Sequence, residues 1–263
     1  MKDWMQAVEY HHAFVKSLAD EHGDYQVLWT SLVGSQNYGL DGENSDVDTF
    51  SIVLPTYLNF ISNTELISFE TDCADGKCVV KDLRLMMNLL RKTSPNSVEV
   101  FASHYKVIEP EYENIALAFF NPDTLFYLTH ANYHNMVNAI AGLANQVHGR
   151  NMTEGKRFSH ILRMDEMYKQ FMNNEHADQL LSFRYEGARD LARIAKFGLG
   201  PAADEYYAST GKRIVDELKA RANDFVETNE MRSIQYTANW TINRLQFELT
   251  KKYLELNGFI YVE

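Results

Sequence analysis

The segment VGSQNYGLDGENSDVDTFSIVLP, residues 33–55, decides how this chain is interpreted. After a Gly-Ser turn it places two aspartates, Asp46 and Asp48, at the start of an apolar run that ends in proline. Residues two apart in a strand point to the same face, so both carboxylates of this aspartate pair should project side by side. Their repulsion is relieved by a divalent cation, and Mg²⁺ takes its ligands from one or two carboxylates plus phosphate oxygens and water.

The same segment also permits a simpler interpretation. A Ser-Asp-x-Asp string is often a solvated turn in which Ser45 or Asp46 caps backbone donors. Upstream, the Gly-Ser turn (Gly34 and Ser35) lies between a predicted strand and a short helix, where N–H groups and a hydroxyl can hold a terminal phosphate. Tyr38 would stack on a base or sugar, or else pack in the core. In the functional interpretation, phosphate ligands and metal ligands converge.

Composition restricts the class of protein. The chain has 263 residues, of which 45% are hydrophobic, enough for a substantial core. A net charge of −11 argues against indiscriminate binding to phosphate backbone, which requires basic residues. No stretch has the length of a membrane span or the pattern of a signal peptide, so we expect a cytoplasmic protein. The two cysteines, Cys73 and Cys78, lack the Cys or His partners of a closed zinc site in the sequence around them, which predicts reduced thiols.

Hydrophobic periodicity divides the chain into two parts. In the first part it predicts helices at 4–21 and 83–92 and strands at 25–33, 47–55, 78–82 and 97–103. In the second part it predicts helices near 113–120, 123–148, 155–173, 186–197, 202–223 and 232–257. The fold class is therefore α+β, with a sheet-containing core at 1–110 and an all-helical region at 111–263.

The order of motifs in residues 33–55 resembles the nucleotidyltransferase signature of the DNA polymerase β superfamily. More specifically, the chain is similar to predicted nucleotidyltransferases of bacteria and phages, in the branch that includes RNA-ligase-associated members. Two further segments carry the resemblance: VVKDLRLMMNLLRKTSPNSVEVF, residues 79–101, and GKRFSHILRMDEM, residues 155–167.

The resemblance implies a small polymerase-β-type sheet completed by the helical region. It implies that Gly34 and Ser35 contact a nucleoside triphosphate such as ATP, and that Asp46 and Asp48 hold catalytic Mg²⁺ or Mn²⁺. Members of the superfamily transfer a nucleoside monophosphate to a hydroxyl on RNA, protein or a small molecule and release pyrophosphate. An NTP and an RNA 3′ end or protein acceptor are thus the expected partners.

One position departs from the family pattern. The resemblance implies a third carboxylate on a neighbouring strand, and Val79 stands where that acid belongs. Asp82 at the strand end is the favoured replacement as a catalytic residue, although it would also serve as the N-cap of the following helix. Asp75 is a second replacement, and a degenerate site that only binds nucleotide or a partner protein is the remaining alternative. Glu99 also matches a family position, or is a paired structural residue.

A group of basic residues recurs in the helical half. Lys156, His160 and Arg163 fall at i, i+4 and i+7 and form a basic stripe along one helix. A solvated face balanced by neighbouring acids is the alternative interpretation. The resemblance favours a nucleotide-binding role, in which the basic stripe faces the aspartate pair and neutralises phosphate charge.

Overall fold

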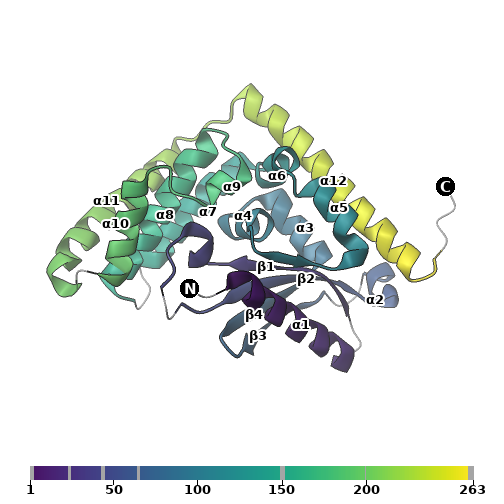
Figure 1. Ribbon diagram of the computed structural model, residues 1–263. Coiled ribbons are helices and arrows are strands. Elements are labelled where there is room, and N and C mark those ends of the chain that lie inside the picture. The colour runs from purple at the N-terminus through teal and green to yellow at the C-terminus, as the bar shows by residue number, and fades with distance from the viewer. Residues whose placement is uncertain are drawn as a thin grey trace.

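The computed structural model describes residues 3–22, 25–42, 45–63, 66–148, 152–198 and 200–259. It is a mixed α+β structure in which helices cover both faces of a five-stranded sheet and a helical region extends to one side (Figure 1). The strands are β1 (Tyr25–Val33), β2 (Asp48–Pro55), β3 (Ser68–Cys73), β4 (Gly76–Asp82) and β5 (Lys106–Ile108). Their spatial order is β3-β4-β2-β1-β5, with a parallel β2–β4 pair and three antiparallel pairs. The predicted strands at 25–33, 47–55 and 78–82 are confirmed, whereas β3 and β5 were not predicted.

Helix α1 (Trp4–His22) covers one face of the sheet, as its periodicity predicted (Figure 1). Val8 packs with residues of β1 and the segment before β2, and Val15 packs with β1, β2 and β4. His11 and His12 are buried under the same helix, where each ring hydrogen-bonds to a threonine of the sheet. This face is therefore unusually polar for a sheet–helix interface.

The opposite face is covered by α3 (Leu83–Lys92) and α4 (Pro95–Ala102), while the short α2 (Tyr57–Ile61) follows β2. The predicted helix at 83–92 is confirmed. The predicted strand at 97–103 is wrong, because residues 95–102 form α4. Ser94 and Ser97 make a reciprocal capping box and Pro95 occupies the first turn, which together start a helix.

The helical half consists of α5 (Glu113–Phe119), α6 (Pro122–Thr129), α7 (Tyr133–His148), α8 (Glu154–Met172), α9 (Ala177–Leu180), α10 (Glu186–Phe197), α11 (Asp204–Asn223) and α12 (Asn229–Leu256). The described part of the chain also contains the 3-10 turns η1 (Ser35–Tyr38), η2 (Pro110–Tyr112) and η3 (Gly200–Ala203). The single helix predicted at 123–148 is two helices, α6 and α7, while the other predicted helices are confirmed. The short α9 was not predicted.

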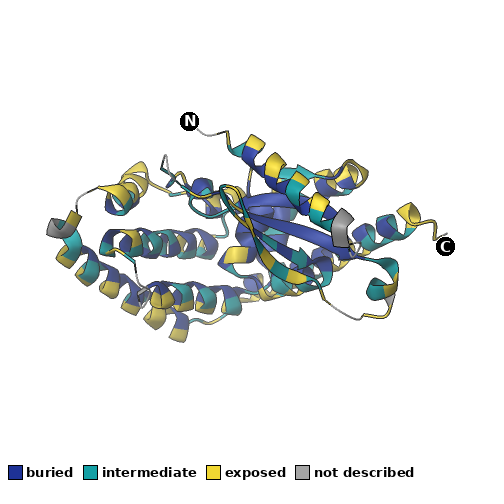
Figure 2. Cartoon of the chain, turned by 90° about the horizontal axis from the view of Figure 1, so that it is seen from below, coloured by how far each residue is buried: buried dark blue, intermediate teal, exposed yellow. Residues whose placement is uncertain are grey.

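One hydrophobic core runs from the sheet into the helical half and includes Leu28, Ile52, Leu128 and Leu245. The C-terminal helix returns to the sheet, where the Tyr253 hydroxyl donates to the carbonyl oxygen at the end of β2 over 2.7 Å. Figure 2 shows the buried sheet in dark blue and the exposed outer faces of the helices in yellow. Among the described residues, no helix combines the length and apolarity needed to cross a bilayer.

Candidate functional site

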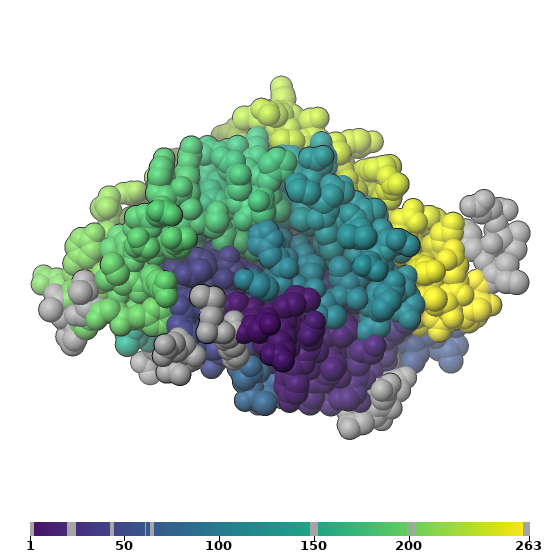
Figure 3. Space-filling model, in the orientation of Figure 1, coloured from purple at the N-terminus to yellow at the C-terminus, as the bar shows by residue number. Residues whose placement is uncertain are grey.

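A cavity of about 490 Å³ lies where the start of β2 faces α8 and α10. Figure 3 shows the green surface of the helical half meeting the indigo surface that follows β1. The residues that line this cavity come from three separate parts of the chain: Gly34, Ser35, Gln36, Gly42, Ser45, Asp46 and Asp48; Thr153, Lys156, His160 and Arg163; Lys196 and Phe197. The structure thus brings together the Gly-Ser turn, the aspartate pair and the basic stripe.

The aspartate pair forms the sheet side of this cavity. Asp46 lies in the loop before β2, Asp48 is the first residue of β2, and both side chains are exposed. Val47 between them is fully buried on the α1 side of the sheet, which places both carboxylates on the cavity side. The backbone of Lys77 hydrogen-bonds to Asp48. Partial burial and then the charge of Asp46 nevertheless raise the pKa of Asp48 above its usual value.

The Gly-Ser turn is held by a buried acid. Gly34 has a positive φ of 99° and precedes η1, and its backbone N–H donates to Glu99 over 3.0 Å. Glu99 also accepts the Tyr38 hydroxyl over 2.7 Å and lies 3.6 Å from Arg163. Glu99 is therefore a paired structural residue that joins α4, the Gly-Ser turn and α8. Its bond occupies the Gly34 N–H, so that donor is already used within the protein, while Ser35 of the same turn lines the cavity.

Tyr38 does not line the cavity. Its side chain is 3% exposed, and the Arg163 guanidinium lies over its ring at 4.4 Å from the centroid. Such cation–π packing fixes the position of the arginine. Tyr38 is therefore placed to support the basic stripe from beneath, and not to stack on a base.

The basic stripe of α8 forms the opposite wall. Thr153 caps α8 by accepting the backbone N–H of Lys156, and the stripe residues then follow along the cavity. Among the described residues, the buried Nε of Arg163 has no hydrogen-bond partner. Arg163 is one of the residues that line the cavity.

Lys196 on α10 is a further basic residue at the site that the sequence did not reveal. Gly155 lets α8 approach α10 closely, since a Cβ there would lie 2.0 Å from the carbonyl oxygen of Ala195. Lys196 donates to the carbonyl oxygen of Leu40 over 2.6 Å. Burial, followed by the charges of Lys156 and Arg163, lowers the pKa of Lys196 to about 8. The cavity therefore concentrates positive charge opposite the aspartate pair.

The structure does not bring Asp82 to this cavity. In the parallel β2–β4 pair, Asp82 lies beside Val53, at the far end of β2 from Asp48. Its buried carboxylate accepts the backbone N–H of Arg84 over 2.8 Å and pairs with that guanidinium at 2.6 Å. This is the N-cap role that the sequence offered as the alternative.

Asp75 and Val79 do not supply a third carboxylate there either. The Asp75 side chain bonds to His11 over 2.8 Å on the α1 side of the sheet, and it does not line the cavity. Val79 pairs with Phe50 across β2 and β4. The neighbouring position on β3, directly opposite Val79, is the exposed Glu70.

Comparison with known proteins adds no assignment to this geometry. No protein-family model matches the chain, and no curated protein is significantly similar to it. The function is therefore argued from the cavity itself.

Proposed function

We propose that the protein is a metal-dependent nucleotidyltransferase of the polymerase-β type, which transfers a nucleoside monophosphate from an NTP to a hydroxyl acceptor. The observation that carries this proposal is the meeting of the Gly-Ser turn, the aspartate pair and the basic stripe around one cavity. The basic stripe is remote in the sequence from the other two patterns, yet all three line the same cavity.

The aspartate pair fits a magnesium ion. Both carboxylates are exposed on the cavity side, and their mutual repulsion contributes to the raised pKa of Asp48. Mg²⁺ favours such oxygen ligands and keeps positions for phosphate oxygens and water. A bound ion would polarise the reacting phosphate and lower the pKa of an attacking hydroxyl.

The opposite wall fits the triphosphate. Lys156, Arg163 and Lys196 place three cations around the cavity, and Ser35 of the Gly-Ser turn also lines it. Charge-assisted hydrogen bonds from such groups hold phosphate oxygens and stabilise the charge that develops on a leaving pyrophosphate.

The proposed reaction joins the acceptor oxygen to the α-phosphorus and breaks the bond between that phosphorus and the bridging oxygen to the β-phosphate. The acceptor hydroxyl loses its proton to solvent, and pyrophosphate leaves. A second hollow of about 610 Å³ shares Gly42 and Phe197 with the cavity and offers room for the acceptor. An RNA 3′ end, a protein hydroxyl and a small molecule are the acceptor classes to be tested.

A nucleotide-binding or protein-interaction module without turnover is the second candidate. The specific observation in its favour is that Asp75, Asp82 and Val79 all fail to place a carboxylate beside the aspartate pair. A general base or second metal ligand on the neighbouring strand is then missing. Binding of NTP without any product distinguishes this candidate from the enzyme.

The test is to incubate the protein with each NTP labelled at the α-phosphate, with Mg²⁺ or Mn²⁺, and with total RNA or cell lysate as acceptor. We expect label on a macromolecule or small acceptor, and loss of that label in the Asp46→Asn, Asp48→Asn double variant. The matched control is Asp224→Asn, an exposed aspartate far along the chain, which should retain transfer. Absence of label with every NTP and metal, despite bound nucleotide, would favour the non-catalytic module.

A further inference from the structure

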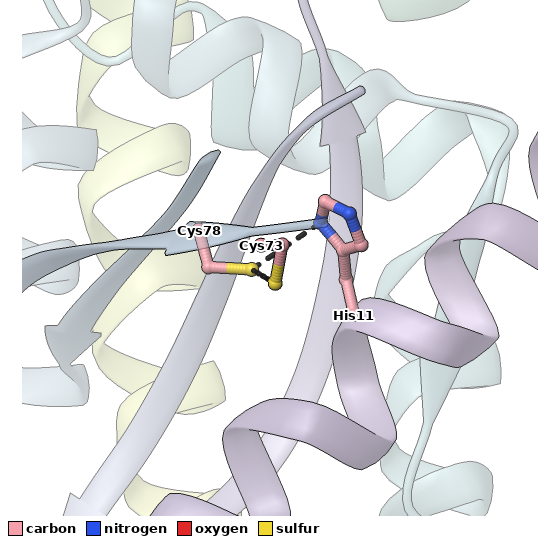
Figure 4. A group of neighbouring side chains, drawn as sticks. All are labelled: His11, Cys73 and Cys78. Atoms are coloured by element: carbon pink, nitrogen blue, oxygen red, sulfur yellow. Dashed lines mark hydrogen bonds between the residues drawn. The ribbon is translucent and has the colours of Figure 1, made fainter. Parts of the chain in front are cut away.

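Three potential soft-metal ligands meet on the α1 side of the sheet, behind the aspartate pair. They are His11 from α1, Cys73 from β3 and Cys78 from β4, and their ligand atoms all lie within 4.8 Å of one another. The two sulfurs are 3.1 Å apart, and Cys78 Sγ lies 3.2 Å from His11 Nδ1 (Figure 4). The sequence did not predict this group, because its histidine is remote from both cysteines along the chain.

The histidine is oriented as a ligand. His11 Nε2 lies 2.8 Å from the Asp75 carboxylate, which favours a proton on that nitrogen. The Nδ1 atom then presents its lone pair to the two sulfurs. A carboxylate on the outer nitrogen of a histidine is the usual support of a metal-binding imidazole, where it fixes the tautomer and the ring orientation.

Thr49, on β2, lies beside these ligand atoms. Thr49 Oγ1 lies 2.9 Å from Nδ1 and 3.3 Å from Cys78 Sγ. It thereby places an oxygen next to two of the three ligand atoms.

We propose that His11, Cys73 and Cys78 form a binding site for a thiophilic metal ion, Zn²⁺ or Cu⁺. Thiolate and imidazole ligands suit both ions, and Zn²⁺ would take Thr49 or a water as its fourth ligand. Zinc–sulfur bonds of about 2.3 Å at tetrahedral angles hold two sulfurs about 3.8 Å apart, so the sulfurs must separate by roughly 0.7 Å. Both cysteines are free, and Cys73 is only half-buried.

A metal bound at this site would stabilise the segment that contains the aspartate pair. The hairpin between Cys73 and Cys78 contacts that segment twice, because the Asp75 carbonyl accepts the Val47 N–H over 2.8 Å and the Lys77 backbone bonds to Asp48. A metal that joins α1 to this hairpin would hold it against the start of β2. Metal binding is thus expected to stabilise the folded chain.

The experiment uses the full chain without an affinity tag, reduced under anaerobic conditions and stripped with a chelator. Titration with Co²⁺, as a spectroscopic substitute for Zn²⁺, and separately with Cu⁺ identifies the preferred ion. We expect one thiolate-bound ion per chain, identified by thiolate-to-metal charge-transfer absorption, and affinity for that ion at least tenfold weaker in Cys73→Ser and Cys78→Ser. The exposed Asp224→Asn is the control and should bind the ion as wild type does.

A second readout requires no variant. The metal should protect both cysteines of the wild-type chain from alkylation, measured by mass spectrometry of peptides. Absence of charge-transfer absorption with both ions, equal binding by the serine variants, or formation of a Cys73–Cys78 disulfide as the sole reaction would overturn the proposal. No nucleotide is present in these assays, so their outcome is independent of the proposed transferase activity.

Discussion

The backbone N–H of Val47 donates to the carbonyl oxygen of Asp75 over 2.8 Å, and this bond fastens the tip of the β3–β4 hairpin to the segment between Asp46 and Asp48. The close approach depends on Gly76, because a Cβ at that position would lie 2.0 Å from the carbonyl oxygen of Val47. The position of the aspartate pair is therefore set by a residue that touches neither carboxylate.

Gly76→Ala should displace the hairpin from the aspartate pair. We expect the free energy of unfolding to fall by about 2 kcal/mol, as for other overpacked sites, and magnesium-dependent NTP binding to weaken. Denaturant unfolding and calorimetry measure the two effects. Gly142→Ala is the control: it lies exposed in α7 with open space around it, and should stabilise the chain by about 0.5–1 kcal/mol. Unchanged stability and NTP binding in Gly76→Ala would show that the β3–β4 hairpin does not determine the position of the aspartate pair.

Lys196 should make anion binding depend on pH. Its pKa is lowered to about 8, so the free cavity holds its full charge below that pH and loses one charge as the pH rises through it. Affinity for inorganic triphosphate should therefore begin to fall near pH 8. Lys196→Gln should bind about tenfold more weakly at pH 7 and show a flatter profile. The exposed Lys212→Gln should keep the wild-type profile, and a wild-type affinity that is constant across pH 8 would contradict this role.

Asp82→Asn should affect stability and leave nucleotide binding unchanged. The buried Asp82 carboxylate is paired with Arg84, and the variant leaves that guanidinium without its counter-charge. Breaking a buried pair in this way costs about 3 kcal/mol, which urea unfolding would measure. Asp216→Asn breaks an exposed pair with Lys212 and should change stability by less than about 1 kcal/mol. Loss of transfer in an equally stable Asp82→Asn variant would restore the catalytic interpretation of Asp82.

His130 should destabilise the fold at mildly acidic pH. It is stacked between Phe126 and Phe171, and burial lowers its pKa from 6.5 to about 4. The unfolded chain binds more protons than the folded one between these values, so the free energy of unfolding falls as the pH falls from 6.5 towards 4. The loss attributable to this group is about 3 kcal/mol.

The difference between wild type and His130→Phe isolates that contribution, since other histidines titrate in both proteins. Urea unfolding at a series of pH values should give a shallower slope for His130→Phe. The exposed His104→Gln should keep the wild-type slope. Parallel slopes for wild type and His130→Phe would contradict the prediction.

Hydrophobic periodicity predicted most of the strands and helices, and the wrong or missed elements have physical causes. In α4 almost every residue is buried, so the short, mostly apolar sequence VEVFA shows no one-sided pattern that would distinguish a helix from a strand. Only the capping serines and Pro95 indicated a helix. Strand β3 alternates exposed acids with half-buried residues at the sheet edge, which resembles a polar loop. The break between α6 and α7 depends on Asn132, whose side chain accepts the backbone N–H of Asn135.

The candidate site was predictable where its residues share a motif. The Gly-Ser turn, the aspartate pair and the basic stripe each have a local pattern, and the fold brings them together. Lys196 has no such pattern, because it joins the cavity only through the packing of α10 on α8. The sequence motifs around Tyr38 and Asp82 suggested direct roles in the site. In the structure, Tyr38 instead packs beneath Arg163, and Asp82 pairs with Arg84.

The most direct test is equilibrium binding of each NTP to the folded protein with and without Mg²⁺, compared between wild type and the Asp46→Asn, Asp48→Asn double variant. We predict saturable binding of at least one NTP that requires Mg²⁺ and weakens at least tenfold in the double variant. Circular dichroism should show that the double variant remains folded, since both side chains are exposed. Failure of wild type to bind any NTP, or equal magnesium-dependent binding by the double variant, would contradict a metal–nucleotide site at this cavity.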